Sequence, residues 1–442
     1  MLLAALNTIF FCFGIYAALS KKINSYLLAL IYFSTSFFGV LSAFTDYGFR
    51  SINNYDFAII LFLIGICFLP KQNNPIEKLK LYRTLNKIIN IFILFVGGLI
   101  FYDIFISGNS FLNVLIESRI YVFLLILKLI ERIDLNKTST LINLIAVLIS
   151  IKAFIYSLQY IFNIEIFETT EFLFSIGKFS GFYALSPLIT IYLLNKLKIT
   201  FTDFFCIFFL VLSSLFFGSS GIILTNAGIL FCFFYLKKSL ITIIFKFFII
   251  PPMILLVVFT SSQIFEEYGI FNEFSQDYNE ATSIVSEFNA SDDITEYYHG
   301  GSFQFRLAMF GERVLYLIEN NRLFFGDGFI PDSKLDSQIF IIGTATDSYI
   351  FGIEQYNSAD FLFVNTISRF GLIGSILFIY LFIYLFKFSK YNMFFFLSFL
   401  IFILLTSLNS NLLYKMNNFV LIYLIIFSEV QSKLKYHHQK KL

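Results

Sequence analysis

The stretch LINLIAVLISIKAFIYSLQYIF, residues 141–162, is long and apolar enough to cross a lipid bilayer as one helix. A spanning helix needs about 20 predominantly apolar residues to cross roughly 30 Å of hydrocarbon. Similar stretches recur from residue 2 to residue 428. They are continuously apolar, whereas the strands of a membrane β-barrel alternate polar with apolar residues. The sequence therefore predicts an all-α, polytopic membrane protein.

The composition supports this class. The 442 residues are 58% apolar and 14% charged, with a mean hydropathy of +0.80, which is too apolar for a soluble domain. The net charge of +2 comes from basic residues scattered between the apolar runs, so no nucleic-acid partner is expected. The four cysteines all fall inside apolar runs, and the sequence carries no P-loop, metal-binding spacing or serine-hydrolase motif. Neither a disulfide framework nor a bound metal or cofactor is expected.

The apolar runs predict a helical bundle of about 12–13 spans with one large extracytoplasmic loop. Residues 1–260 form a first bundle of about 10 spans, residues 261–358 form the polar loop, and residues 359–442 hold the last spans and a basic tail. The expected spans lie near 2–20, 23–44, 55–69, 88–107, 113–130, 138–162, 179–195, 199–217, 219–236, 240–260, 359–386, 393–408 and 419–428.

Lysine and arginine in alternate short connections predict the orientation, because cytoplasmic loops carry an excess of these residues. The basic connections lie at 21–22, 71–87, 131–137, 195–198, 237–238 and 387–390. The tail is then cytoplasmic and the polar loop lies outside. With about 13 spans the N-terminus is outside, and with about 12 it is inside.

Within the polar loop, FQFRLAMFGERVLYLIENNRLF predicts an amphipathic helix near 302–325 that stops at Gly326. Arg306 and Arg313 are seven residues apart and therefore share one stripe of that helix. The stripe could face anionic headgroups or a phosphorylated ligand, or it could simply solvate a loop helix.

Ionisable residues within spans are costly, about 2.5–3.5 kcal/mol at mid-bilayer on insertion scales, and are therefore candidates for function. Lys152 lies within its span, and Arg369 lies too deep in its span for easy snorkelling. Asp103 and Arg119 lie at adjoining ends of neighbouring spans and are expected to pair. Most such groups lie at the predicted outer face, which favours chemistry there over a carrier with a polar midplane.

Three stretches resemble the O-antigen polymerases and ligases of bacterial cell envelopes. FRLAMFGERVLYLIENNRLFFGDGF resembles the family's outer-loop helix and Gly-x-Gly turn, with Arg306, Gly326 and Gly328 in those places. SADFLFVNTISRFGLIGSILFI is similar to the segment that leaves the loop for the next span, and SIGKFSGFYALSPL carries Lys178 where arginine is common. Ligases usually carry histidine where Asp360 stands, so the departure favours a polymerase.

The resemblance implies a metal-independent glycosyltransferase without a cofactor, a multi-pass protein of the bacterial inner membrane. Such an enzyme moves a growing glycan from undecaprenyl diphosphate onto a sugar hydroxyl of an incoming lipid-linked repeat, at the outer face, for O-antigen or a similar surface polysaccharide. Its partners would be the lipid-linked oligosaccharide, the bilayer and a polysaccharide chain-length regulator. Two alternatives stay open: a ligase that transfers the polymer to lipid A-core, and a flippase or transporter of lipid-linked sugars.

Departure of a lipid diphosphate builds negative charge, and the arginine fork matches phosphate oxygens. We therefore expect Arg306 and Arg313 to be catalytic, together with Asp360, which stands at the family's base-like position. The residues expected to bind substrate are Arg119, Lys152, Lys178, Arg322 and Arg369.

Overall fold

The structure, a computed structural model, describes most of the predicted helices and a central part of the polar loop. The residues described are 2–35, 54–72, 74–135, 137–162, 185–196, 198–216, 220–236, 302–329, 362–389, 392–409, 413 and 416–439. All regular secondary structure within these ranges is helical, as the sequence predicts.

Three described helices are long and apolar enough to cross a membrane. They are α5 (Lys80–Phe105), α8 (Thr138–Phe162) and α16 (Leu362–Ser389). At about 1.5 Å per residue, the 26 residues of α5 extend about 39 Å, which exceeds the hydrocarbon thickness. The two ends of α5 therefore reach the polar regions on either side.

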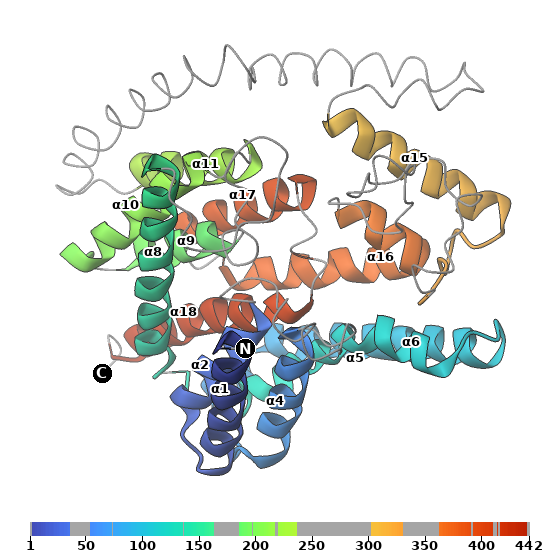
Figure 1. Cartoon of the computed structure of the whole chain (residues 1–442), viewed down its shortest axis with the longest axis horizontal. Coiled ribbons are helices and arrows are strands. Elements are labelled where there is room, and N and C mark those ends of the chain that lie inside the picture. Colours follow the sequence, from blue (N-terminus) through green and yellow to red (C-terminus); the bar gives the residue numbers. More distant parts are fainter. Residues whose placement is uncertain are drawn as a thin grey trace.

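Shorter apolar helices surround these three (Figure 1). The first group, α1 (Leu2–Leu19), α2 (Ile23–Ser34) and α4 (Asn54–Phe68), packs together at the bottom of the view. A second group packs beside α8 on the other side of α16. Its members are α9 (Ser186–Asn195), α10 (Phe201–Phe216), α11 (Ser220–Leu236) and α17 (Met393–Asn409).

The predicted span at 113–130 is not one continuous helix. The chain forms α6 (Phe111–Ser118), then the 3-10 segment η2 (Arg119–Leu125), then α7 (Ile126–Ile130). The β-branched and aromatic run IYVF at 120–123 favours the α-helix poorly. Arg119 and Glu117, on either side of the break, are also held by partners on α4 and α16. Tertiary contacts therefore replace the regular helix that length and hydropathy predict.

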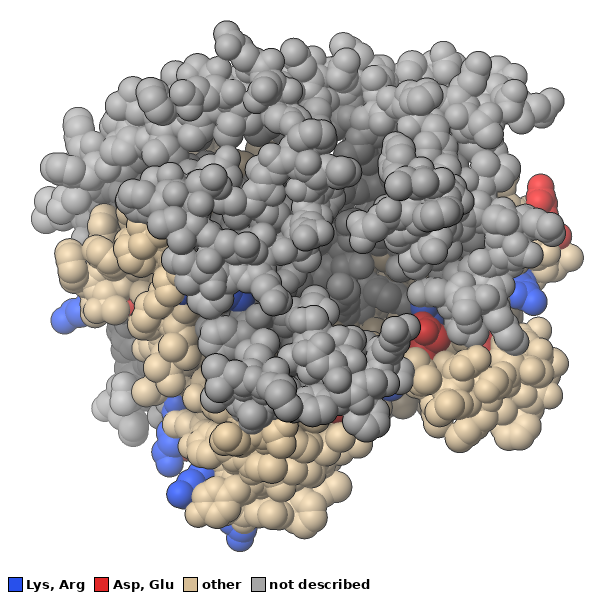
Figure 2. Space-filling view, viewed as in Figure 1, with Lys and Arg blue, Asp and Glu red and all other residues tan. Residues whose placement is uncertain are grey.

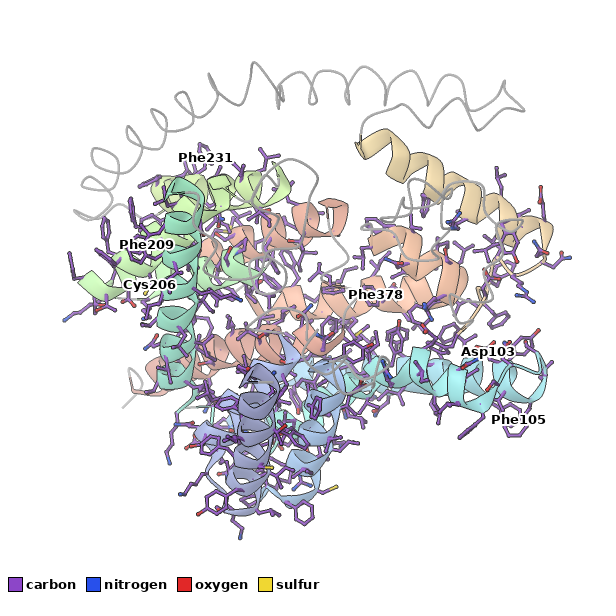
Figure 3. The ribbon with its side chains drawn as sticks, viewed as in Figure 1. Asp103, Phe105, Cys206, Phe209, Phe231 and Phe378 are labelled. Carbon is purple, nitrogen blue, oxygen red and sulfur yellow. The ribbon has the colours of Figure 1, made fainter. Side chains whose placement is uncertain are left out.

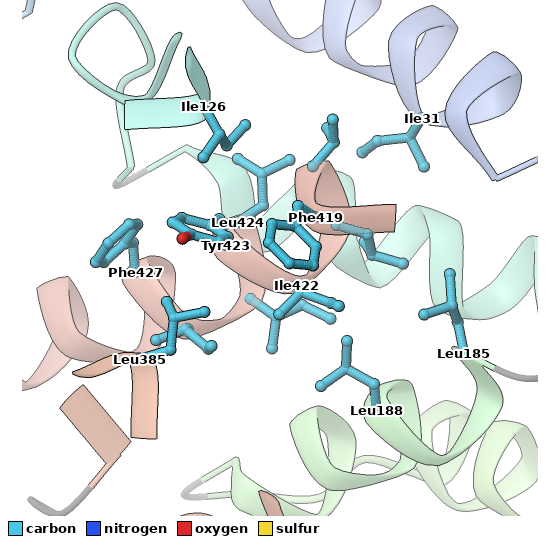
Figure 4. Packing of buried hydrophobic residues seen from close by; sticks show 14 of the residues in the cluster. Ile31, Ile126, Leu185, Leu188, Leu385, Phe419, Ile422, Tyr423, Leu424 and Phe427 are labelled. Carbon is cyan, nitrogen blue, oxygen red and sulfur yellow. The ribbon is translucent and has the colours of Figure 1, made fainter. Parts of the chain in front are cut away.

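The last predicted span, 419–428, is the first half of a longer helix, α18 (Phe419–Gln439). Its residues Phe419 to Phe427 are completely buried, in agreement with a stretch that is apolar on every side. Figure 4 shows them packed among Ile31, Ile126, Leu188 and Leu385, which come from four other helices. α18 is thus the centre of the core.

The helix predicted within the polar loop is α15 (Ser302–Glu319), and it packs against α16. It ends earlier than the predicted stop at Gly326. Asn321 adopts a left-handed conformation (φ 57°), and the backbone N–H groups of Asn321 and Arg322 donate to the carbonyls of Ile318 and Leu317. This pair of hydrogen bonds defines the Schellman motif, in which asparagine can replace the usual glycine. The helix therefore stops at Asn321 and not at the predicted Gly326.

Candidate functional site

The helix α16 is broken at Gly371, and the break is filled by another part of the backbone. Gly371 has φ 59° and ψ −163°, a conformation that is essentially restricted to glycine. In an unbroken helix the N–H groups of Leu372 and Ile373 would donate to the carbonyls of Ser368 and Arg369. All four groups are instead satisfied by the segment Arg322–Phe329, which we call the docked turn.

Four backbone hydrogen bonds join the docked turn to α16. In two of them α16 donates to the turn, and in the other two the turn donates to α16. Each donor and each acceptor freed by the break in α16 therefore has a new partner. An unsatisfied backbone group costs several kcal/mol where water is absent, which makes this exchange a strong constraint within a membrane. The bonds are Leu372 N–H to Leu323 O (2.8 Å), Ile373 N–H to Phe324 O (3.1 Å), Asp327 N–H to Ser368 O (2.7 Å) and Gly328 N–H to Arg369 O (3.0 Å).

Two glycines allow this close approach of backbone to backbone. A Cβ at Gly326 would lie 2.5 Å from the carbonyl carbon and oxygen of Arg369, and one at Gly371 would lie 2.5 Å from the carbonyl carbon of Phe324. Both glycines also have positive φ. The Gly-x-Gly turn and the Gly371 segment, which are far apart in the sequence, thus meet directly in space.

Asp103 fixes the docked turn to a second long helix. Its carboxylate, near the end of α5, accepts a hydrogen bond of 2.6 Å from the backbone N–H of Phe329. Figure 3 shows Asp103 beside the docked turn, while Phe105, two residues further, points away from the bundle. The expected pairing of Asp103 with Arg119 is wrong: the turn, not the neighbouring span, supplies the partner of Asp103. The turn therefore bridges α5 and α16.

Arginines and carboxylates gather around the docked turn. Arg322 Nη1 lies 3.1 Å from Asp327 Oδ1, and Arg369 Nη2 lies 2.7 Å from Glu117 Oε2 on α6. The guanidinium of Arg369 also lies 6.0 Å from the centre of the Phe329 ring, within reach of a cation–π interaction. Figure 2 shows acidic and basic atoms together at the right of the view, between α5–α6 and α15. We call Arg313, Arg322, Arg369, Asp103, Asp327 and Glu117 the charged cluster.

Arg313 and Asp327 are deeply buried members of the cluster. Arg313 is completely buried, and the side chain of Asp327 is 1% exposed. Burial raises the pKa of the Asp327 carboxyl above its ordinary value, although the Arg322 and Arg313 guanidinium groups lower it in part. The second carboxylate oxygen, Oδ2, is buried and accepts no hydrogen bond from the described residues. A buried carboxylate with an open oxygen is suited to hold a hydroxyl or a proton.

Arg119, a predicted substrate-binding residue, is held against α4 at the start of η2. Its Nε lies 3.0 Å from Asp56 Oδ1, and Nη2 donates to the hydroxyl of Tyr55 at 2.7 Å, both on α4. The guanidinium also lies 4.8 Å from the centre of the Tyr55 ring. These contacts anchor the break between α6 and α7 to α4, in agreement with a structural role.

The structure does not bring Lys152 to the charged cluster. This buried lysine belongs to α8, which packs against α10 and lies across the molecule from α15 (Figure 1). Arg306 lies on α15, but its side chain is outside the described part of the chain. Lys178 and Asp360 also lie outside the described residues. Of the predicted site residues, Arg313, Arg322 and Arg369 therefore meet at one place.

Three carboxylates of the cluster were not predicted as site residues. No pattern in the sequence distinguishes Glu117, the position of Asp103 predicts a pair with Arg119, and Asp327 is the middle residue of a Gly-x-Gly turn. An acid between two glycines is a weak signal, since it is common in any turn. Among the described residues, no group of three metal-ligating side chains is placed to hold a metal ion.

The long apolar helices define a class, that of multi-pass helical membrane proteins. No protein-family model matches the chain, and no curated protein is similar enough to count as a relative. The charged cluster therefore has to be interpreted from its own chemistry.

Proposed function

We propose that the chain is a glycan polymerase of the bacterial inner membrane. It would move a growing glycan from undecaprenyl diphosphate to a sugar hydroxyl of an incoming lipid-linked repeat. The proposal includes the bundle of about 12–13 spans and an extracytoplasmic position of residues 261–358. It rests on one observation above all, the buried cluster of arginines and carboxylates at one end of two membrane-spanning helices.

The position of the cluster suits a lipid-linked substrate. Asp103 lies two residues before the end of α5, and Arg369 lies two residues before the break of α16, so the cluster sits where hydrocarbon gives way to headgroups. A polyprenyl diphosphate places its charge at this depth while its tail stays in the bilayer. A carrier that works by alternating access would place its polar groups near the midplane instead.

The charges of the cluster suit the proposed transfer. Arg322 is half exposed and could bind the departing diphosphate, for which arginine supplies a planar, permanently charged fork. The neighbouring Arg313 and Arg369 supply positive potential in a buried setting, where electrostatic stabilisation of a transition state is strongest. The acceptor hydroxyl needs a base, for which Asp360 is the expected residue, and Asp327 adds a second carboxylate with an open oxygen.

A gene deletion with display of the surface glycan on a gel tests the proposal. Core that carries a single repeat means a polymerase. Bare core with polymer left on its lipid carrier means a ligase, and bare core with untranslocated precursor means a flippase. Either of the latter two results would overturn the proposal.

Point variants test the assignment of residues in the same assay. Arg322→Ala, Arg306→Ala and Asp360→Ala should lose long-chain polymer at normal protein level, because one preorganised electrostatic contact typically contributes about 10²–10³ in rate. Arg83→Ala is the matched control, since Arg83 is exposed near the other end of α5, and it should keep full polymer length. Full-length polymer in all three variants would remove these residues from the mechanism.

A further inference from the structure

The docked turn carries two large apolar side chains on its outside. Phe324 and Phe325 are 59% and 57% exposed, although neighbouring residues of the same turn, Asp327 and Phe329, are buried. Two adjacent exposed phenylalanines are unfavourable in water, since each leaves a large apolar area in contact with solvent. The part of the chain that the structure describes leaves them uncovered.

The covering can be inferred from the depth of the turn along α16. The backbone N–H of Ile373 donates to the carbonyl of Phe324, and that of Leu372 donates to Leu323, so Phe324 lies beside these two residues. Leu372 and Ile373 are each 37% exposed on a helix apolar enough to span the membrane. The exposed residues Phe324 and Phe325 of the turn thus lie at the level of the exposed residues Leu372 and Ile373 of α16, and we call these four residues the apolar patch.

The length of α16 places this patch at the edge of the hydrocarbon. The residues from Gly371 to Ser389 extend about 28 Å at about 1.5 Å each, which is close to the roughly 30 Å of a bilayer core. Leu372 and Ile373 are the first residues of that stretch. The contact of the turn with Asp103, near the end of α5, gives the same depth independently.

We infer that the docked turn is a membrane-anchoring element, with Phe324 and Phe325 inserted between the lipids at one boundary of the bilayer. Phenylalanine is one of the apolar side chains that interfacial elements bury at the boundary of headgroups and acyl chains. The partner is the lipid of the surrounding leaflet. Anchoring would hold the charged cluster at headgroup depth. The anchoring requires no particular substrate, so its test is independent of the proposed activity.

The absence of tryptophan from the chain allows a direct test, because a single introduced tryptophan is the only one present. We would place purified Phe324→Trp and Phe325→Trp proteins in vesicles of phosphatidylcholine brominated either near the glycerol or near the chain ends. Both should show blue-shifted emission and a larger loss of emission with the shallow bromine than with the deep one. Emission typical of water, quenched by aqueous iodide and not by either lipid, would overturn the inference.

Two control variants calibrate the measurement. Leu94→Trp, on a position 75% exposed in the middle of α5, should be quenched most by the deep bromine. Asn320→Trp, on an exposed polar position next to the turn, should respond to iodide and not to brominated lipid. The Asn320 variant also shows whether tryptophan itself draws the turn into the bilayer, since lipid quenching there would remove the support for the inference.

A second measurement uses the unaltered protein, in case the variants do not fold. Lipid that carries a photoreactive diazirine near the glycerol should label the peptide containing Phe324 and Phe325. Absence of label on this peptide, with label recovered on Leu372 and Ile373, would place the turn outside the membrane.

In the fluorescence experiment, a blue-shifted tryptophan whose emission depends on the protein-to-lipid ratio and not on bromine would indicate a second copy of the chain and would also overturn the inference.

Discussion

The two ends of α5 hold their charges in different ways. The start of α5 contacts α7 through the hydrogen bond from the Tyr82 hydroxyl to the Leu127 carbonyl. On α7 and in the connection that follows it, two ion pairs are local and exposed: Lys137 pairs with Asp134 at 3.6 Å and Lys128 with Glu131 at 3.9 Å, and the two lysine side chains are 75% and 49% exposed. Near Asp103, two of the contacts join residues more than 200 positions apart, and Arg369 and Asp327 are almost completely buried.

The difference teaches what each set of charges does. Exposed pairs contribute about 0–1 kcal/mol, so the pairs of the basic connections add little to stability. A buried pair is costly to form and costly to break, and its hydrogen bonds must be complete. The burial of these charges at that cost, with the backbone of α16 opened around them, supports the proposed site.

The largest effect is expected at Gly371, where the break in α16 depends on a backbone conformation open to glycine. Gly371→Ala should destabilise the protein by about 3 kcal/mol or more, because strain of about 1–3 kcal/mol is added to a clash with Phe324. Gly98→Ala is the matched control, since a Cβ there meets nothing within 4 Å and alanine favours the helix. Thermal unfolding of both variants in detergent measures the contrast, and equal melting temperatures would contradict the role of the break.

The next largest effect is expected at the pair Arg369–Glu117. Glu117→Gln leaves a buried guanidinium without its carboxylate, and because Glu117 is 23% exposed the loss should stay below the about 3–5 kcal/mol typical of a fully buried pair. Arg369→Gln should cost less, since it leaves the partly exposed partner. The double variant should cost less than the sum of the two. A double-mutant cycle on unfolding measures this coupling. Strict additivity would show that the pair is not coupled.

A moderate effect is expected at Asp103. Asp103→Leu removes the acceptor of the Phe329 N–H and leaves a buried donor unsatisfied, at about 1–3 kcal/mol. Asp103→Asn keeps an amide oxygen in that place and should lose less. Protease sensitivity of the docked turn in vesicles, together with the melting temperature, distinguishes them. If the asparagine variant were the less stable of the two, the negative charge would be the important feature instead of the hydrogen bond.

The smallest effect is expected at the exposed pair Lys137–Asp134 in the connection between α7 and α8. Lys137→Ala removes an exposed pair with Asp134 and should change stability by less than about 1 kcal/mol. Its melting temperature should match that of the unaltered protein in high and low salt. A large change in melting temperature would mean that this exposed pair contributes substantially to stability.

Much of the fold could be predicted because apolar run length is a property of the sequence alone. The ranges expected near 2–20, 55–69 and 138–162 agree closely with α1, α4 and α8. The failures have two causes, which are contacts with distant residues in one case and a local helix cap in the other. The run at 113–130 breaks where Glu117 and Arg119 are held by other helices, and the loop helix ends at Asn321 through a local cap.

The candidate site was predictable only in part. Arginine is an evident partner for phosphate, so Arg313, Arg322 and Arg369 were found from residue type and position. The sequence does not predict their three carboxylate neighbours. In two of the contacts the partners are more than 200 residues apart in the sequence. A carboxylate becomes informative only once its burial is known.

The sequence by itself determined the all-helical membrane class, since the cost of burying polar backbone in lipid leaves few structures for long apolar runs. It also determined which glycines could take unusual conformations. Only the tertiary structure decided that the Gly326–Gly328 turn and the Gly371 break belong together. Opened helical hydrogen bonds must find new partners, and the partners lie in a segment more than 40 residues away in the sequence.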